Sequence, residues 1–438
     1  MTSLFTRRSP GTDTSAPFQD LKSRIHRLLI DRIDLSKLDL LGGSELELEI
    51  TTVLEMLIAE QGVPLSRQEK ERLITEVQHE TFGLGPIEPL LSSPDISDIL
   101  VNNCRSTYVE RHGRLEKTDI VFRDNSHLLQ IIERIVARVG RRIDESSPYV
   151  DARLEDGSRV NAIIPPLSID GPALSIRRFG LTPFRINDLI SRGAFDQRIA
   201  TVLEGAVKSR LNILICGGTG TGKTTLLNVI SEFIPEDERI ITIEDSAELQ
   251  MKQDHVVRLE TRPANIEGSG EVTQRDLVRN SLRMRPNRII IGEVRGGEAL
   301  DMLQAMNTGH DGSISSIHAN TVRDALSRLA TMVMMAGMEL PDRAIREQIA
   351  SAINLIIHLV RFPDGSRKIV KIAEITGMEA NTVVMQDIFL FDQKGVDRDG
   401  RVTGEFRPTG IRPVFAERFK VTGFDLPPGL FEGGADPW

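Results

Sequence analysis

The sequence has little of several features that mark particular protein classes. Only two of its 438 residues are cysteines, Cys104 and Cys216, so it offers neither a disulfide framework nor a cysteine-based metal site. A reducing cytoplasm is therefore the expected compartment. No uncharged apolar run approaches the ~20 residues that a membrane-spanning helix needs, and the N-terminus lacks the apolar core of a signal peptide. We therefore expect a soluble protein that meets a membrane only through partners.

The chain also lacks net positive charge, and aromatic rings are scarce. The formal net charge is −9, the isoelectric point is about 5.6, and aromatic residues make up 4% of the chain. Such a chain has no overall basic field to attract nucleic acid and few rings on which bases could stack, so we expect no nucleic-acid partner. A local basic pore remains open as an alternative.

The length exceeds that of one ordinary core and predicts two or three domains. We divide the chain into a disordered arm, a helical module, an α+β domain, a linker, and a nucleotide-binding domain with a C-terminal tail: 1–17, 18–81, 82–179, 180–193 and 194–438. The arm is polar and rich in Ser, Thr and Pro. Three amphipathic patterns predict the module, and the third opens with a capping box at Ser66 and Glu69. The stretch "FGLGPIEPLL" marks the next boundary.

The segment after residue 194 alternates apolar strand patterns with helical ones. Its strand-like runs are "LNILIC", "RIITIED", "HVVRLE", "NRIIIGE" and "SISSIH". Nearly continuous β-branched runs separated by helices predict a parallel sheet that is buried on both faces. Three later runs, "INLIIHLVRF", "RKIVKIAEIT" and "TVVMQDIFLF", follow one another with short turns and are expected to be antiparallel. The fold class predicted for this domain is therefore α/β.

Residues 214–227, "LICGGTGTGKTTLL", contain the pattern G-x-x-x-x-G-K-[ST] between a strand and a helix. Glycines let consecutive backbone N–H groups point at phosphate oxygens, and the following helix directs its positive end at the same anion. Lys223 supplies a charge for the β- and γ-phosphates, and the Thr224 hydroxyl is a ligand for Mg²⁺. We therefore predict ATP and Mg²⁺ as ligands. The residues expected to hold them are Gly217, Gly218, Thr219, Gly220, Thr221, Gly222, Lys223, Thr224 and Thr225.

Acidic residues end two of the predicted parallel strands. Glu244 and Asp245 close "RIITIED", and Glu293 closes "RIIIGE". Ligand groups gather at the carboxyl ends of parallel strands, so these acids can orient water and hold a metal. Gly292 stands where many nucleotide-binding loops are accompanied by an Asp. We therefore assign Glu293 to the metal side, together with Thr224, and prefer Glu244 as the base. The alternative is that either acid only caps a loop.

The stretch "NTGHDGSISSIHANT" carries His310 and His318 on either side of a predicted strand. A lone histidine is usually structural, but two around one strand near the phosphate site could sense the γ-phosphate. From the residues alone, both interpretations stand.

Taken together, these motifs resemble the ATPases of type II and type IV secretion and of type IV pili. The upstream stretches "DARLEDGSRVNAIIPPL" and "LSIRRF" support the resemblance, which runs from about residue 70 to the C-terminus. Within that superfamily the chain looks most like the CpaF/TadA-type ATPases of tight-adherence (Flp) pili. The resemblance implies a RecA-like ATPase domain preceded by a smaller, PAS-like α+β domain. It also implies a homohexameric motor that is cytoplasmic and is peripherally associated with the inner membrane through a polytopic platform protein.

The resemblance further implies that arginines of the α+β domain reach the nucleotide phosphates. The matching positions are Arg159, Arg177 and Arg178. Arginine from another domain suits this role because its charge stabilises the transition state of phosphoryl transfer. A separate stripe at helical spacing, Arg275, Arg279 and Arg283, is interpreted as a solvated or subunit-facing edge rather than a catalytic set.

Two other functions belong to different classes. A nucleic-acid translocase, including a conjugation-type secretion ATPase, would also use a ring of such domains, and stimulation by single-stranded DNA would distinguish it. An ATP-gated scaffold that does not hydrolyse ATP would need neither the glutamates nor the arginines. We therefore expect an ATP hydrolase that powers assembly, and with it possibly retraction, of a pilus or related secretion machine.

Overall fold

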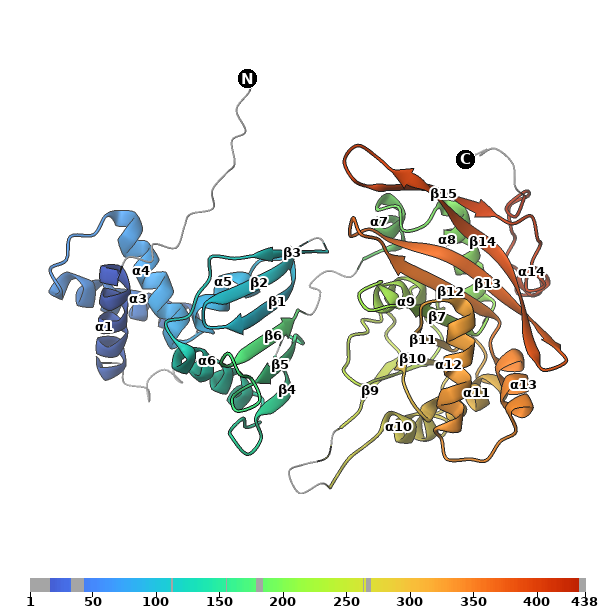
Figure 1. Ribbon diagram of the computed structural model, residues 1–438, viewed down its shortest axis with the longest axis horizontal. Coiled ribbons are helices and arrows are strands. Elements are labelled where there is room, and N and C mark those ends of the chain that lie inside the picture. Colours follow the sequence, from blue (N-terminus) through green and yellow to red (C-terminus); the bar gives the residue numbers. More distant parts are fainter. Residues whose placement is uncertain are drawn as a thin grey trace. The chain divides into compact units, whose positions relative to one another are not determined.

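The computed structural model describes residues 16–32, 43–111, 113–154, 156–178, 184–262, 264 and 269–432 (Figure 1). Contacts divide the chain into two units, residues 1–181 and 182–438. The segment expected to be a disordered arm lies outside the described residues up to residue 15. Ala16 and Pro17 already belong to the first helix.

The first unit begins with a three-helix module of α1 (Ala16–Arg32), α3 (Gly43–Glu60) and α4 (Arg67–Thr81). Apolar residues at helical spacing, such as Leu21, Ile25 and Leu29, are buried at its centre. The predicted capping box is confirmed, since the backbone N–H of Glu69 donates to Ser66 Oγ and that of Ser66 to the Glu69 carboxylate.

Near its C-terminus, α4 carries the buried carboxylate Glu80. This group accepts hydrogen bonds from Lys22 of α1, at 3.0 Å, and from His127 of the following α+β domain, at 2.9 Å. Burial alone would raise the pKa of Glu80, but the contacts with His127 and Lys22 lower it to about 2. The charged network therefore ties the helical module to the α+β domain within the same unit.

The α+β domain is a six-stranded antiparallel sheet in the order β3-β2-β1-β6-β5-β4. Its elements are η1 (Gly85–Ile87), α5 (Glu88–Leu91), β1 (Ile96–Asn103), β2 (Ser106–Arg111), β3 (Arg114–Lys117), α6 (Asn125–Arg138), β4 (Tyr149–Arg153), β5 (Arg159–Ile163) and β6 (Ala173–Arg177). The apolar face of α6 packs with alternate strand residues into one buried core. The sheet is built from the antiparallel pairs β2–β3 and β4–β5, and β1 lies between β2 and β6.

The second unit contains a nine-stranded sheet in the order β15-β14-β13-β12-β7-β11-β10-β8-β9. Its strands are β7 (Ile213–Gly217), β8 (Ile240–Glu244), β9 (Val256–Glu260), β10 (Arg288–Val294), β11 (Ile314–His318), β12 (Leu355–Arg361), β13 (Arg367–Glu379), β14 (Thr382–Val396) and β15 (Val402–Pro408). The six strands from β12 to β9 are parallel, and β13, β14 and β15 extend them in antiparallel fashion.

Helices cover both faces of this sheet. They are α7 (Ile186–Ser191), α8 (Gln197–Lys208), α9 (Lys223–Ser231), α10 (Gln274–Ser281), α11 (Glu298–Asn307), α12 (Val322–Met334), α13 (Asp342–Ala352) and α14 (Ala416–Val421). Successive β7 residues face opposite sides, so Ile213 and Ile215 pack with α8, α9 and α14, while Leu214 and Cys216 pack with α10 to α13. Burial on both faces explains why these strands appear as continuous apolar runs. The predicted α/β class is confirmed.

The extent of the linker and the pairing of one strand differ from what the sequence predicted. Part of the predicted linker 180–193 forms α7, and Ile186, Leu189 and Ile190 pack against the core of the second unit. The run "INLIIHLVRF" was expected to be antiparallel, but β12 pairs in parallel with β7 and in antiparallel only with β13.

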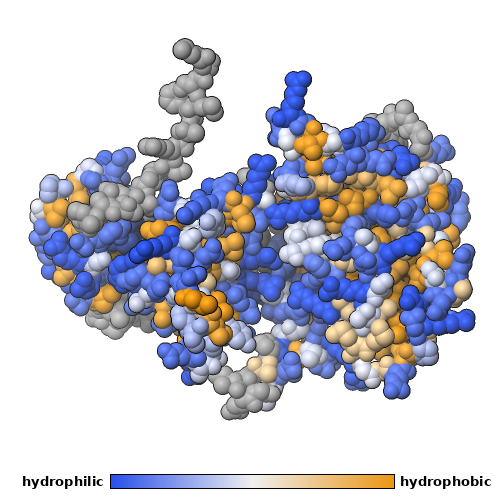
Figure 2. Space-filling model, viewed as in Figure 1, coloured by the Kyte–Doolittle hydropathy of each residue, from blue (hydrophilic) through white to orange (hydrophobic). Residues whose placement is uncertain are grey.

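The surface of the molecule is mostly hydrophilic on the face shown in Figure 2, with scattered apolar patches. Within the described ranges, no helix combines the length and the apolar character needed to cross a bilayer.

Candidate functional site

The loop after β7 has the geometry expected of a phosphate cradle. It leads directly into α9, which begins at Lys223. Gly222 adopts a left-handed φ of 93°, which favours glycine. At Gly217, a Cβ atom would lie 2.6 Å from the Leu359 carbonyl oxygen of β12, so no side chain fits there. Glycine is therefore required where the strand turns into the loop.

Lys223 lies folded against this loop. Its Nζ donates to the carbonyl oxygens of Gly217 and Gly218, both at 3.1 Å. Burial lowers the pKa of Lys223, and the nearby Glu293 carboxylate opposes that effect. A bound phosphate would offer the ammonium group a stronger partner than neutral carbonyls, so the side chain is positioned to turn toward an anion.

Four neighbouring parallel strands place the predicted site residues at one edge of the sheet. β7 ends in the glycine-rich loop, β11 ends at His318, β10 carries Glu293, and β8 ends at Glu244. The registers align these ends, since His318 lies opposite Gly217 and β8 and β10 run level up to the Ile243–Ile291 pair. The edge at which the strands end is thus the phosphate-loop edge, as the sequence predicted.

Glu244 is the most perturbed acid at this edge. Its side chain is 3% exposed, and Oε1 accepts hydrogen bonds from the backbone N–H groups of Glu248 at 2.8 Å and Leu249 at 2.9 Å. Oε2 is buried and has no hydrogen-bond partner in the described part of the chain. Burial raises the pKa of Glu244 to about 7, despite the opposing backbone hydrogen bonds. The group can therefore exchange a proton near neutral pH.

Gly292 makes room for this side chain. A Cβ atom at Gly292 would lie 3.0 Å from Glu244 Cγ, a contact so tight that the Glu244 side chain would have to shift. The absence of an Asp at this position, noted in the sequence, thus has a steric reason. The carboxylate comes from the neighbouring strand and occupies the space in front of the glycine.

Glu293 takes part in an ion-pair network. Arg295 donates to Glu293 Oε2 at 2.8 Å and to Asp245 Oδ2 at 3.1 Å. Arg295 therefore bridges acids from β10 and from the turn after β8. The sequence analysis did not single out Arg295, although it follows the strand by one residue.

The two histidines occupy opposite ends of β11. His318 lies beside Gly217. The backbone N–H of Ala319, the residue after His318, donates a hydrogen bond to the Gly217 carbonyl oxygen at 3.3 Å. His310 precedes the strand, where the backbone N–H groups of Gly312 and Ser313 donate to Asn212 at the start of β7. The structure thus brings His318 to the loop but does not bring His310 there.

The three arginines of the first unit also differ in environment. Strand pairing places Arg153, Arg159 and Arg177 side by side across β4, β5 and β6, and Asp98 of β1 continues the row. Directly opposed residues of antiparallel strands share one face of the sheet, so this row concentrates positive charge. Arg177 donates to Asp98 at 3.0 Å. The sequence analysis did not single out Arg153, because its place in the row depends on strand register.

Arg178 points elsewhere. Its guanidinium donates to the carbonyl oxygens of Ser93 and Ile96, which precede and begin β1. This contact stabilises the entry into the sheet. Arg178 is therefore held inside its own domain.

Two arginines of the second unit approach the phosphate loop and were not predicted. Arg367 of β13 donates from Nε to the Gly220 carbonyl oxygen at 2.8 Å. Arg361 of β12 lies so close that its Nη1 would be 3.0 Å from a Cβ at Gly220. Both come from the hairpin that joins β12 to β13, which lies next to β7 through the parallel pairing of β12.

The donor set fits a metal that arrives with a nucleotide. Within the described residues, no group of three or more His, Cys, Asp or Glu is arranged to hold a metal ion. Mg²⁺ usually keeps several waters and binds through one or two protein groups plus substrate phosphates. Thr224 at the start of α9 and Glu293 at the same sheet edge suit that pattern.

Comparison with known proteins agrees with this geometry. The family model described as "Type II/IV secretion system protein" matches residues 80–404. The chain belongs to this family. A second model, "Type II secretion system protein E, N-terminal domain", matches residues 18–80, which include the helical module. The predicted membership of the secretion superfamily is confirmed, but its CpaF/TadA-type subgroup is not established.

Several relatives carry functional names. The chain is 38% identical over 309 residues to a putative conjugal transfer protein of Mycobacterium tuberculosis, covering 69% of this chain and 87% of that protein. It is 32% identical over 305 residues to the type IV secretion system protein VirB11 of Brucella suis, covering 64% and 84%.

Similar solved structures include the VirB11 ATPase from Brucella suis in complex with sulphate. Its sequence identity is 29%, its TM-score is 0.36, and the match covers 67% of this chain and 96% of that one. The Legionella pneumophila ATPase DotB matches with 25% identity, a TM-score of 0.46 and coverages of 64% and 76%.

Proposed function

We propose that this member of the secretion family is an ATP-hydrolysing motor that works as a homohexameric ring. In this proposal the ring is cytoplasmic and acts on a polytopic platform protein of the inner membrane. Hydrolysis powers assembly of a tight-adherence pilus or a related secretion machine. The observation that carries the proposal is the alignment of the phosphate loop, His318, Glu293 and Glu244 along one sheet edge.

In the proposed mechanism, each strand end has a separate task. The loop N–H groups, Lys223 and the Thr224 hydroxyl hold the phosphates and the Mg²⁺ that arrives with them. Glu293, one strand nearer to the loop than Glu244, lies on the metal side. Glu244 takes a proton from the attacking water, which its raised pKa allows near pH 7. His318, next to Gly217, senses the loss of the γ-phosphate.

Arginines complete the charge neutralisation. Arg361 and Arg367 already lie against the loop within the same unit. Arg159, which is half-buried, and Arg177, which is exposed, lie side by side on the first unit, which suits contact with phosphate supplied by another domain or subunit. The contact of Arg178 with Ser93 and Ile96 argues for a positioning role for that residue. A head-to-tail ring would allow one subunit to complete the site of the next.

Conjugation-type secretion is the second candidate. The observation that favours it is the similarity to the putative conjugal transfer protein and to VirB11. The two candidates share the same chemistry and differ in what the machine moves. The low aromatic content and the net charge of −9 favour a role without direct nucleic-acid contact.

The test is the ATPase rate of the full chain against protein concentration, with and without single-stranded DNA. We expect specific activity to rise with concentration, to ignore DNA and to be lost in Lys223→Ala. Strong stimulation by DNA would favour the translocase instead. ATP binding without hydrolysis at every concentration, also in the presence of platform protein, would contradict the motor and leave the scaffold.

A further inference from the structure

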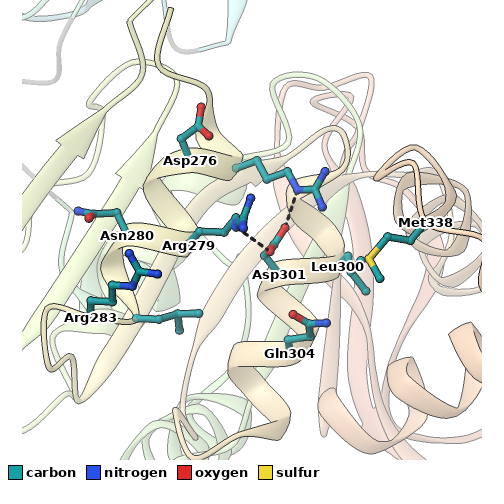
Figure 3. A pocket seen from close by; sticks show the side chains of 10 residues that line it. Asp276, Arg279, Asn280, Arg283, Leu300, Asp301, Gln304 and Met338 are labelled. Atoms are coloured by element: carbon teal, nitrogen blue, oxygen red, sulfur yellow. Dashed lines mark hydrogen bonds and ion pairs between the residues drawn. The ribbon is translucent and has the colours of Figure 1, made fainter.

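The second unit has a surface pocket of about 560 Å³ away from the phosphate loop (Figure 3). Its walls come from α10, α11 and the segment after α12. Three arginines at helical spacing line one side: Arg275, Arg279 and Arg283. The proposed ATPase cycle uses none of these residues.

The positive charge of the pocket is only partly neutralised. Arg275 donates to Asp301 at 2.8 Å and to the Ala336 carbonyl oxygen at 2.9 Å. Arg279 lies 3.9 Å from the same carboxylate, and its side chain is 66% exposed. Among the described residues, Arg283 makes no ion pair. Asp301 thus serves Arg275 first. The pocket's second carboxylate, Asp276, accepts hydrogen bonds from Thr273, so three arginines face two acids and Arg279 and Arg283 can attract a further carboxylate.

The same pocket also offers apolar surface. Leu282 and Leu300 contribute to its lining, and Met338 projects at its other side, 50% exposed. A methionine adapts its shape to a partner because its side chain is unbranched and flexible. An occupant should therefore combine a carboxylate with an adjacent aliphatic side chain.

The first unit displays that combination on one loop between β5 and β6. Ile169 is 95% exposed, Leu167 is also exposed, and Asp170 follows directly. Leu167 and Ile169 together give this loop an apolar surface that is free to pack against another molecule. Asp170 makes no ion pair within the described part of the chain. Its carboxylate is therefore available to an arginine.

We propose that the loop of residues 167–170 of one copy of this chain binds the arginine-lined pocket of a second copy. Asp170 pairs with Arg279 and Arg283, while Ile169 packs on the apolar side around Met338. The interacting surfaces are different, so the contact is head-to-tail and can propagate from copy to copy until a ring closes. This inference rests on the proposed hexameric ring, because it names the contact that joins neighbouring copies in that ring.

Charge reversal tests this contact in the full chain. Sedimentation velocity with MgATP or a non-hydrolysable analogue gives the concentration at which half of the protein is assembled. We expect Arg279→Glu/Arg283→Glu to raise that concentration at least about tenfold, because like charges then face each other. Asp170→Arg should have the same effect. Combining all three changes in one chain should restore assembly, since every contact again joins opposite charges.

A second variant tests the apolar part. Ile169→Asp should also raise the assembly concentration, whereas its matched control Val421→Asp, at another exposed apolar residue, should not. Arg407→Glu, on exposed β15, is the control for the loss of an arginine. Circular dichroism would verify that each variant folds.

Three outcomes would overturn the proposal. In the first, all pocket and loop variants assemble at the same concentration as the wild type. In the second, the variant that combines the three charge changes does not recover assembly. In the third, the wild-type chain never assembles. ATP binding is measured separately on the same proteins. A wild-type chain that does not bind ATP would refute the proposed function, whereas altered assembly with intact ATP binding concerns only the contact.

Discussion

Replacing Glu244 by Gln tests the chemistry of the sheet edge through stability as well as activity. The pKa of this carboxyl group is about 7 in the folded chain, against an ordinary 4.5. Because the folded state holds the proton more tightly, this group favours folding at low pH. Its contribution is lost as the pH rises from about 4.5 to about 7. The full difference corresponds to about 3 kcal/mol at about 1.4 kcal/mol per pH unit.

The Gln side chain keeps the shape of Glu244 but does not titrate. Between pH 5 and pH 8, we therefore expect the unfolding free energy of the wild type to fall by about 2 to 3 kcal/mol relative to Glu244→Gln. Other groups titrate equally in both proteins and cancel in the difference. Urea unfolding followed by circular dichroism provides the measurement, and the transition of the second unit is identified by its shift with MgATP.

Hydrolysis supplies an independent readout. The wild-type rate should rise with pH through about 7, because the base must be deprotonated, and Glu244→Gln should be at least about 100-fold slower. Glu405→Gln is the matched control, since Glu405, on the edge strand β15, is paired with Lys394 and has no role in the proposed site. Parallel stability curves for wild type and Glu244→Gln would refute the raised pKa. Normal hydrolysis by Glu244→Gln would refute its role as base.

Three other changes test separate parts of the structure. Gly292→Ala places a Cβ against Glu244, so kcat should fall about tenfold with little change in ATP affinity, measured by steady-state kinetics and ATP titration; unchanged kcat would contradict the steric account. Because the folded-state pKa of Glu80 is about 2, the first unit should lose about 3 kcal/mol as pH falls from 5 to 2, and Glu80→Gln should show no such dependence in acid unfolding. Asn212→Ala removes the buried amide that joins Ala352 and Gly312, so urea unfolding should show a loss of about 2 to 4 kcal/mol, and a loss below 1 kcal/mol would contradict that role.

Local pattern was enough to predict five strands of the second unit, β7 to β11, and their parallel arrangement. Continuous β-branched runs indicated parallel strands, and parallel strands collect their C-terminal residues at one edge. That reasoning located Glu244, Glu293 and His318 together with the phosphate loop. It left open whether His310 also lies there, and the structure places His310 before β11, at the opposite end of the strand from His318.

The local sequence pattern could not predict which distant segments pair with each other. Arg361 and Arg367 approach the loop only because β12 lies beside β7, and nothing in the run "INLIIHLVRF" distinguishes parallel from antiparallel pairing. The row that includes Arg153 depends in the same way on register across three strands. Arg178 follows Arg177 directly in the sequence but makes different contacts, because successive strand residues face opposite sides of the sheet.

Gly292 and Glu244 show that an acidic motif at the end of a strand is best interpreted together with the neighbouring strands of the sheet, and not from the sequence of one strand alone. In sequence, Gly292 is a missing acid. In the structure, the neighbouring strand supplies a carboxylate to the space that the glycine leaves, and burial there gives that carboxylate its raised pKa. An Asp at position 292 would both displace Glu244 and place a second negative charge against it. The glycine is therefore a condition for the proposed role of Glu244 as a base, and substitutions at the two positions should not be additive.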